Sequence, residues 1–431
     1  MENYLNELVK NALPLHEHEA IGPLIQSIKD KKIVMIGEAT HGTEEFYKWR
    51  QHISQELIMN HGFNIIGIEG DWPASHEVNK FIKGDVSQSA RETLSHFKRW
   101  PTWMWANVEF LSFMEWLKVW NETAEKKINF YGLDLYSLYE SMDQVVAILR
   151  ENDLDLISMV AENYQCLEKY RPNEKSYVKS LHHHPQACRK QVTEVLRALK
   201  NTGLDELDEA DKLNLIQNAQ IVVNAENYYR SLISGQSSWN IRDEHMMATI
   251  QMLLDYQGKD AKMIIWEHNT HVGDYRATDM VLSGDVNIGG LAREIYGKEE
   301  VALVGFGTYS GSVTASYKWD GPIQIFDVPE GRERSVELFC HQAVPKIGSE
   351  DFYILLNEIE KSSSLSEVLG HRAIGVVYDP ELEHRGNYVP TSLLNRYDAF
   401  IFLNHTHYLK ALNAPFDYNE IPQTYPFGNR I

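Results

Sequence analysis

Short runs of apolar residues recur along the chain, and most of them are rich in valine and isoleucine. Their apolarity is continuous rather than alternating, which is typical of strands covered on both faces, as in a parallel sheet. The runs comprise residues 32–37, 64–70, 128–134, 262–269, 301–308, 372–379 and 399–405. Stretches long enough for crossover helices separate the first three runs. The pattern therefore predicts an α/β fold with a mostly parallel central sheet flanked by helices.

A helix is predicted directly after the first of these runs. Thr43 is placed as its N-cap, and Glu44 and Glu45 lie in its first turn, where carboxylates favour a helix N-terminus. One apolar face is formed at helical spacing by Phe46, Trp49, Ile53 and Leu57.

The alternation of strands and helices stops after residue 134. Residues 137–151, 205–233 and 242–257 have the periodicity of long amphipathic helices. We therefore predict a mainly helical insertion, residues 136–258, that covers a cleft, and an α/β core, residues 1–135 and 259–431, that carries the site. Within the insertion, His182 to His184 precede Pro185, and adjacent side chains do not share a helix face, so a surface loop is predicted there.

Composition narrows the class of protein. The chain has 431 residues, is 43% hydrophobic and carries a formal charge of -20, so it lacks the basic excess that a nucleic-acid partner requires. Three well-separated cysteines suit a reducing compartment, and neither a signal peptide nor a membrane-spanning run is apparent. These features predict a cytoplasmic protein with no nucleic-acid or membrane partner.

Ionisable residues follow four of the predicted strands at the point where each strand ends. They are Glu38 and His41, then Glu69 and Asp71, then Asp134, and finally Glu267, His268 and His271. A polar segment that follows a single strand is usually an ordinary loop. Four such segments at the carboxyl edge of one parallel sheet, where binding sites are commonly built, indicate a catalytic site.

The residues at these strand ends favour hydrolysis by activated water. No GxSxG, GxxxxGK[ST] or GxGxxG pattern is present, so a serine nucleophile and a nucleotide site lack support. A histidine held by a carboxylate can take a proton from water, and a second imidazole or an arginine can stabilise the oxyanion. Arg50, nine residues after His41, is a candidate for that role, with a surface ion pair as the alternative.

A zinc site is the competing interpretation. His268 and His271, together with Glu38, His41 and Glu69, have ligand types that suit zinc. The sequence HNTH lies at a strand exit, however, and is not the helical HExxH signature.

Several segments together resemble the erythromycin esterase family. They are GEATHGTEEFYKWR, IGIEGDWP, GLDLYS, RDEHMMA and WEHNTHVGD, in this order and over nearly the whole chain. Members of that family include enzymes that open macrolide lactones by hydrolysis, and others are labelled succinoglycan biosynthesis proteins. The resemblance implies an α/β core with a large helical section beside the cleft.

The resemblance also implies roles for individual residues. It makes His41 the general base and Glu38 its carboxylate partner, and it places Arg50 and Glu69 in the pocket. His268 and His271 match the two histidines of the family's HNxH pattern. We assign the catalytic role to His41, Glu38, His268, Glu69 and Arg50, and substrate binding to His271, Asp134 and Arg242. The reaction in this family is described as needing no metal, so no cofactor is predicted.

The predicted partner is a small-molecule ester or lactone, with macrolides and antibiotic resistance as the expectation from the resemblance. The alternatives are a polysaccharide-associated or binding protein, such as a succinoglycan protein with the same fold, and a zinc-dependent hydrolase. The oligomeric state stays open. The aromatic segment 99–105 either lines an apolar pocket or packs a helix against the sheet.

These assignments make geometric predictions. Glu38, His41, Glu69 and His268 should converge in one cleft at the carboxyl edge of the sheet, with Arg50 reaching it from the first helix. His41 and His268 should lie within about 12 Å, because catalytic groups act through hydrogen bonds or one water. Arg242 and Asp243 should begin a helix beside the cleft.

Overall fold

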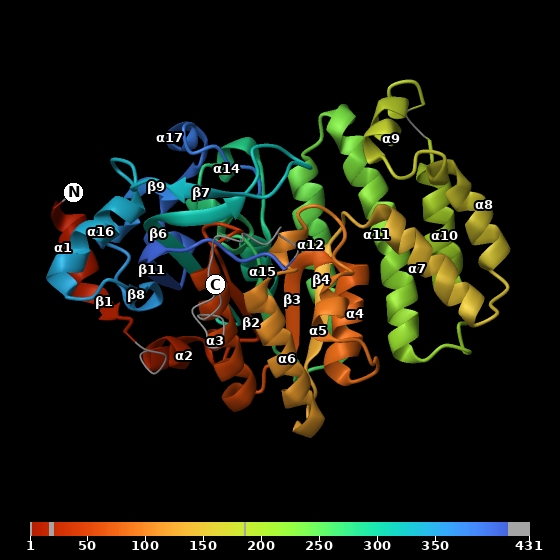
Figure 1. Cartoon of the computed structure of the whole chain (residues 1–431), viewed down its shortest axis with the longest axis horizontal. Coiled ribbons are helices and arrows are strands. Elements are labelled where there is room, and N and C mark those ends of the chain that lie inside the picture. Colours follow the sequence, from red (N-terminus) through yellow and green to blue (C-terminus); the bar gives the residue numbers. More distant parts are fainter. Residues whose placement is uncertain (1, 17–20, 185–186, 413–431) are drawn as a thin grey trace, which may run out of the picture.

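A mixed sheet lies at the centre of the chain, in a computed structural model that describes residues 2–16, 21–184 and 187–412 (Figure 1). Within these residues the sheet has nine strands in the order β1-β8-β11-β6-β2-β5-β3-β4, with β7 paired to β6. Neighbours from β11 to β4 are parallel, whereas β1, β8 and β7 pair antiparallel. The predicted fold class, an α/β protein with a mostly parallel sheet, is confirmed.

The strands of this sheet are β1 Ala12–Pro14, β2 Ile33–Ile36, β3 Ile65–Asp71, β4 Asn129–Asp134, β5 Met263–Trp266, β6 Val301–Ala315, β7 Gln324–Val328, β8 Phe352–Leu355 and β11 Ala399–Thr406. A separate antiparallel pair is formed by β9 Val368–Arg372 and β10 Tyr388–Ser392.

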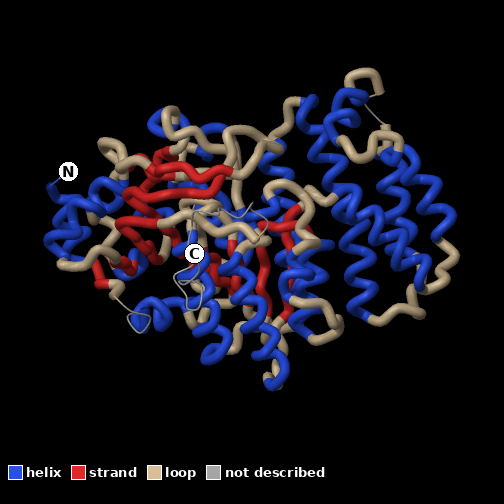
Figure 2. Tube along the Cα trace, viewed as in Figure 1, coloured by secondary structure: helices blue, strands red, loops and turns tan. Residues whose placement is uncertain are grey.

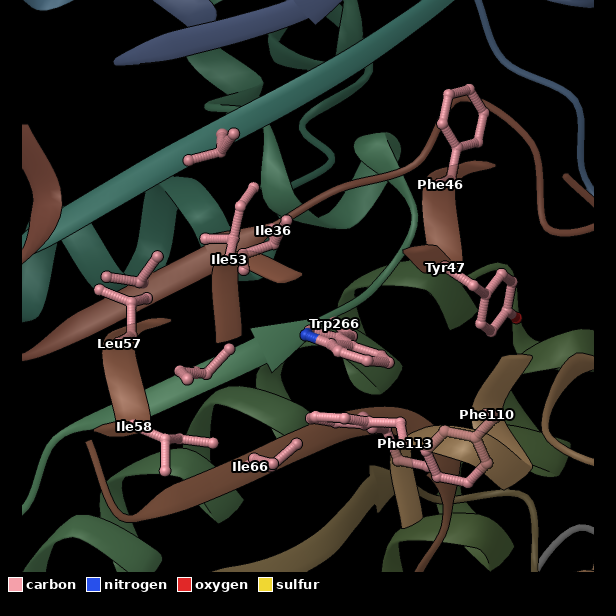
Figure 3. Packing of buried hydrophobic residues seen from close by; sticks show 14 of the residues in the cluster. Ile36, Phe46, Tyr47, Ile53, Leu57, Ile58, Ile66, Phe110, Phe113 and Trp266 are labelled. Atoms are coloured by element: carbon pink, nitrogen blue, oxygen red, sulfur yellow. The ribbon is translucent and has the colours of Figure 1, made fainter. Parts of the chain in front are cut away.

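Burial on both faces explains why the strand sequences are apolar throughout. In β2, Val34 and Ile36 face one apolar cluster, whereas Ile33 and Met35 face the other, and all four are fully buried. The first face is covered by α2 Gly22–Ile28, α3 Glu44–His61, α4 Trp72–Lys83, α5 Ala90–Leu94 and α6 Val108–Thr123. Figure 3 shows Trp266 of β5 packed on Phe113 of α6, with ring centroids 4.8 Å apart.

The opposite face is covered mainly by α1 Glu2–Asn11, α12 Ser238–Gln257, α15 Ile288–Tyr296 and α16 Val336–Ile347. The α/β part of the chain also contains four short helices: α13 Asn269–Val272, α14 Met280–Ser283, α17 Glu383–Gly386 and α18 Leu393–Arg396.

Between β4 and β5 the chain is helical. The helices are α7 Leu138–Glu151, α8 Ile157–Glu168, α9 Glu174–Leu181, α10 Arg189–Asn201, α11 Glu209–Ser234 and α12. Helices α7 to α11 gather beyond β4 at one end of the molecule, around their own apolar cluster (Figure 2). His182 to His184 are exposed in the turn after α9, and Pro185 lies outside the described residues. No helix among the described residues has the length and apolarity needed to cross a membrane.

Two local predictions were wrong. The run 372–379 is not a strand of the central sheet: β9 ends at Arg372, and beyond it Ile374 and Val377 form only isolated bridges to Thr40 and Ser316. Of this run, Ile374 and Tyr378 are buried in a small apolar cluster with β6 and β7, whereas Val377 is 40% exposed. Arg242 and Asp243 do not begin a helix, since α12 starts earlier, at Ser238, after the cap formed by the Ser237 side chain.

Candidate active site

The loop after β2 is shaped by two close approaches of neighbouring chain segments. A Cβ atom on Gly37 would lie 2.2 Å from Asn269 Oδ1, and a Cβ on Gly42 would lie 1.9 Å from the Thr314 carbonyl oxygen. Both positions therefore require glycine for contact rather than for backbone freedom. The two glycines bracket Glu38 and His41 and let the loop pack closely between β5 and β6.

Glu38 links the loop to helix α3. His41 Nδ1 lies 2.9 Å from Glu38 Oε1, and Arg50 Nη2 lies 2.7 Å from Glu38 Oε2. Arg50 is fully buried, with its guanidinium 4.2 Å from the Tyr47 ring centroid and 5.1 Å from that of Trp266. Arg50 thus contacts Glu38 from the interior, and its charge acts on His41 through that carboxylate.

Arg242 of α12 ties two strand ends together. Its Nη2 donates to Glu69 Oε1 and to Asp134 Oδ2, each at 2.7 Å, and its Nε donates to Asp134 Oδ1 at 3.0 Å. The guanidinium also packs over the Tyr136 ring at 4.9 Å. One cation therefore holds the ends of β3 and β4 against the last helix of the insertion.

His268 forms the N-cap of the short helix α13. Its backbone N–H donates to Glu69 Oε2 at 3.0 Å, and its Nδ1 accepts from the Thr270 backbone N–H at 3.3 Å. Nδ1 also lies 2.8 Å from Thr270 Oγ1, and since the backbone N–H already donates to Nδ1, we assign the hydroxyl as a second donor to it. This assignment places the proton of a neutral imidazole on Nε2. Within the described residues Nε2 makes no hydrogen bond, and the Ala39 backbone has only a small effect, which raises the pKa of the ring. The ring centroid is 4.7 Å from that of His41.

His271 is held on both nitrogens and on one ring face. Nδ1 lies 2.9 Å from Asp243 Oδ1, and Nε2 accepts from Arg242 Nη1 at 2.9 Å. The ring stacks on Trp239 with centroids 4.4 Å apart and planes 5° apart. His271 therefore fixes Arg242 in place, and no ring nitrogen is left for a ligand.

The two facing histidines have opposite proton affinities. Burial lowers the pKa of His41, but the carboxylates of Glu69 and Glu38 outweigh that effect and raise it above its usual value. Burial, and then the nearby His41, hold the pKa of His268 well below the usual range. An imidazole that gains a proton readily thus faces one that stays neutral, which is the pairing expected of a base and a hydrogen-bond donor.

The carboxyl groups around the two histidines also differ strongly in pKa. Burial raises the pKa of Glu69, but His271, Arg242 and His41 outweigh it, and the net pKa lies below the usual range. For Asp71, burial raises the pKa to about 7, against the Arg99 guanidinium whose Nε lies 3.1 Å away. Glu267 is buried without a hydrogen bond on either oxygen in the described residues, and burial with neighbouring Glu69 raises its pKa well above normal. The environment therefore favours the ionised form of Glu69 and the protonated form of Glu267.

Glu267→Gln is expected to stabilise the protein above pH 4.5. In that range Glu267 is ionised in the unfolded chain but keeps its proton in the folded chain. The free energy of unfolding of the wild type therefore falls as pH rises, by up to about 1.4 kcal/mol per pH unit. Below pH 4 both forms are protonated and the gain should vanish. Urea unfolding at several pH values measures this. The surface variant Glu125→Gln should show no such slope, and an equal slope in both variants would contradict a buried protonated Glu267.

Most of the side-chain atoms that could bind zinc already pair with other protein groups. Glu69 uses both oxygens for Arg242 and His268, and Glu38 uses both for His41 and Arg50. Among the residues that the structure describes, no group of three or more His, Cys, Asp or Glu side chains is arranged to hold a metal ion.

Residues from five segments that are distant in sequence meet at this edge of the sheet. The cluster contains Glu38, His41, Glu69, Asp134, Arg242, His268 and His271, all proposed from the sequence. Asp243 and Trp239 were missed as contributors. Asp243 could have been proposed because it is next to Arg242, which the sequence analysis assigned to the site. No sequence feature near Trp239 indicates that it stacks on His271. The aromatic segment 99–105 buries Trp103, Met104 and Trp105, and Trp105 Nε1 donates to the Glu69 carbonyl at 2.9 Å.

The fold and the cluster of histidines and carboxylates define an α/β protein with a candidate hydrolytic site. The chain belongs to the erythromycin esterase family, whose family model matches residues 58–406. That range includes Glu69, Arg242 and the HNTH turn, and Glu38 and His41 precede it. At the level of the family, the chain is an esterase-like hydrolase.

Individual relatives are distant. The chain is 23% identical over 374 residues to an erythromycin esterase type II of Escherichia coli, covering 80% of this chain and 85% of the relative. A solved succinoglycan biosynthesis protein is similar with a TM-score of 0.78 and 21% identity, over 95% of this chain and 98% of the other. An EreC erythromycin esterase mutant in its open conformation has a TM-score of 0.67 and 16% identity, over 91% and 95%. These structures share the fold.

Proposed function

We propose that the protein hydrolyses a carboxylic ester or lactone by direct attack of water, with His41 as the general base. The observation that carries this proposal is the His41–His268 pair, in which two rings 4.7 Å apart have opposite proton affinities. A basic imidazole beside a neutral N–H donor is the minimum needed to activate water and hold the resulting oxyanion.

In this mechanism His41 Nε2 takes a proton from water as its oxygen bonds to the carbonyl carbon. Glu38 Oε1 accepts the His41 Nδ1–H and stabilises the imidazolium that forms. The His268 Nε2–H donates to the oxyanion of the tetrahedral intermediate. When the ester C–O bond breaks, His41 returns its proton to the leaving oxygen, and the products are an acid and an alcohol.

The other assigned residues support these groups. Arg50 pairs with the Glu38 carboxylate, and Glu69 raises the pKa of His41. Arg242, Asp134 and His271, which we assign to substrate binding, hold one another in the described structure. We propose that they form the wall against which the substrate lies, rather than free ligands for it.

The proposed partner is a small-molecule ester or lactone. Macrolide lactones are included because two similar proteins are named erythromycin esterases. We also propose a cytoplasmic location, since Cys166, Cys188 and Cys340 are free thiols.

A substrate panel tests the proposal. Purified protein is assayed against macrolides, simple lactones and aryl esters, in parallel with His41→Asn. Turnover by the wild type that the variant lacks supports the proposal. Turnover that is equal in both, or absent in both, favours a binding protein, such as one associated with a polysaccharide like succinoglycan. Inactivation by a chelator with recovery on adding zinc favours the metal-dependent alternative.

The pH dependence of kcat/KM gives a separate prediction. Because the general base must be unprotonated and the pKa of His41 is raised, the acid limb should have its midpoint above 6.5, the usual value for histidine. In Glu69→Gln, which removes the foremost influence that raises this pKa, the midpoint should move down. A wild-type midpoint at or below 6.5, or an unchanged midpoint in the variant, would contradict the assignment.

A further inference from the structure

A segment near the C-terminus of the described chain lies directly on the His41 loop. The Ile374 backbone N–H donates to the Ala39 carbonyl at 2.8 Å, and Ile374 forms a parallel bridge with Thr40. Ile374 is fully buried. The end of β9 is thereby held against the loop that carries Glu38 and His41.

His371 at the end of β9 is one half of a buried acid–imidazole pair. His371 Nδ1 lies 2.7 Å from Glu337 Oε1, which also accepts from the Arg372 backbone N–H at 2.8 Å. Burial lowers the pKa of His371. For Glu337, burial is outweighed by His371 and Arg372, so its pKa is lowered too. A neutral His371 therefore donates from Nδ1 to an ionised Glu337 and presents Nε2 as an acceptor.

The partner of that acceptor is Asn269, the residue after His268. Asn269 Nδ2 lies 3.3 Å from His371 Nε2 and donates its other proton to the Phe306 carbonyl at 2.7 Å. Its Oδ1 accepts from the Phe306 backbone N–H at 3.2 Å. Both N–H groups and the oxygen of the amide are thus used, so the amide has one orientation that satisfies them.

Asn269 joins the two catalytic segments. Its backbone N–H donates to the Glu38 carbonyl at 2.9 Å, and its side chain occupies the space that a Cβ on Gly37 would need. A shift of Asn269 would therefore move His268 relative to the loop that bears His41.

We propose that His371, oriented by Glu337, is a positioning residue that sets the separation of His41 and His268 through Asn269. His371 touches neither of the two reacting imidazoles in the described structure and acts only through this amide. The inference rests on the proposed function for its kinetic consequence, whereas its geometric consequence stands without it.

Two matched substitutions separate positioning from general stability. An asparagine amide reaches about as far as Nδ1 of histidine, so His371→Asn keeps a donor for Glu337 and loses the contact with Asn269. A glutamine amide reaches about as far as Nε2, so His371→Gln keeps an acceptor for Asn269 and loses the donor to Glu337. Each variant loses one buried hydrogen bond. The bond that His371→Gln loses is to the ionised Glu337 carboxylate, so this variant should have the lower melting temperature of the two, and a larger kinetic effect in His371→Asn would not follow from stability.

Kinetics and structure should then differ between the two variants. With an ester found in the substrate panel, His371→Asn should lower kcat by about 10- to 100-fold with KM little changed, while His371→Gln stays within about threefold of wild type. Crystal structures should show the His41–His268 separation of 4.7 Å retained in His371→Gln and altered in His371→Asn.

Equal kinetics in the two variants, or an unchanged ring separation in His371→Asn, would overturn the inference. The two failures are distinguishable. If no ester is hydrolysed even by the wild type, the proposed function fails, and the ring separation in the variant structures still decides whether His371 positions the pair.

Discussion

His41→Asn is expected to lower kcat by about 10²- to 10⁴-fold, the usual contribution of a general base, with the melting temperature nearly unchanged. The asparagine amide can replace the His41 Nδ1–H as donor to Glu38 Oε1, so the carboxylate stays paired in the variant. It provides no atom that can accept a proton at the position of Nε2. Steady-state kinetics on the best ester of the panel, with circular dichroism for the fold, measures both quantities.

The control for this variant is His182→Asn, a substitution of an exposed histidine in the turn after α9. It should leave kcat unchanged. A loss of activity that is the same in both variants would indicate a general effect of histidine replacement and would contradict a specific role for His41.

The second large effect is expected on stability, from Arg242→Met. This variant removes the cation that bonds both Glu69 and Asp134, and it leaves these buried carboxylates and His271 Nε2 without that partner. Breaking one side of a buried ion pair usually costs about 3–5 kcal/mol. We expect a loss of that size in the free energy of unfolding, together with loss of activity, measured by urea denaturation and the ester assay.

Arg242→Lys should recover only part of the stability, because one ammonium cannot reproduce the forked contacts with Asp134 and the contact with His271. Arg197→Met is the matched surface control, since Arg197 pairs with Glu194 on the exposed side of α10, and its loss should not be measurable. A stability change in Arg242→Met no larger than that control would contradict its role in joining β3, β4 and α12.

The sequence predicted the fold best where a strand is buried on both faces, because such a strand is apolar along most of its length. The central strands β2, β3, β5 and β6 are covered on both faces, so their apolar runs could be recognised without knowing their partners. The same rule gave a wrong result at 372–379, where Ile374 and Tyr378 pack against β6 and β7 without joining the sheet and Val377 is 40% exposed. An apolar run therefore does not by itself distinguish a strand of the sheet from a segment that packs beside it.

The gathering of ionisable groups could also be foreseen, because the carboxyl ends of parallel strands meet at one edge. Their individual partners could not. Arg242 reaches Glu69 across 173 positions of sequence, and Arg50 faces Trp266 in the interior rather than the cleft. The contact between His371 and Asn269 likewise depends on tertiary packing alone. Such pairings leave no local pattern, since each is set by how separate elements approach one another.

The most direct test of direct water attack is a single turnover in H₂¹⁸O, with enzyme in excess over the best ester of the panel. If His41 activates water, the product acid carries one ¹⁸O atom from the first turnover, and the mass of the protein stays unchanged at every time point. A product acid that carries no ¹⁸O after the first turnover, with the label appearing in an enzyme carboxylate, would show that a protein group attacks the ester first. An acyl-enzyme adduct in the protein mass spectrum would contradict the account in the same way.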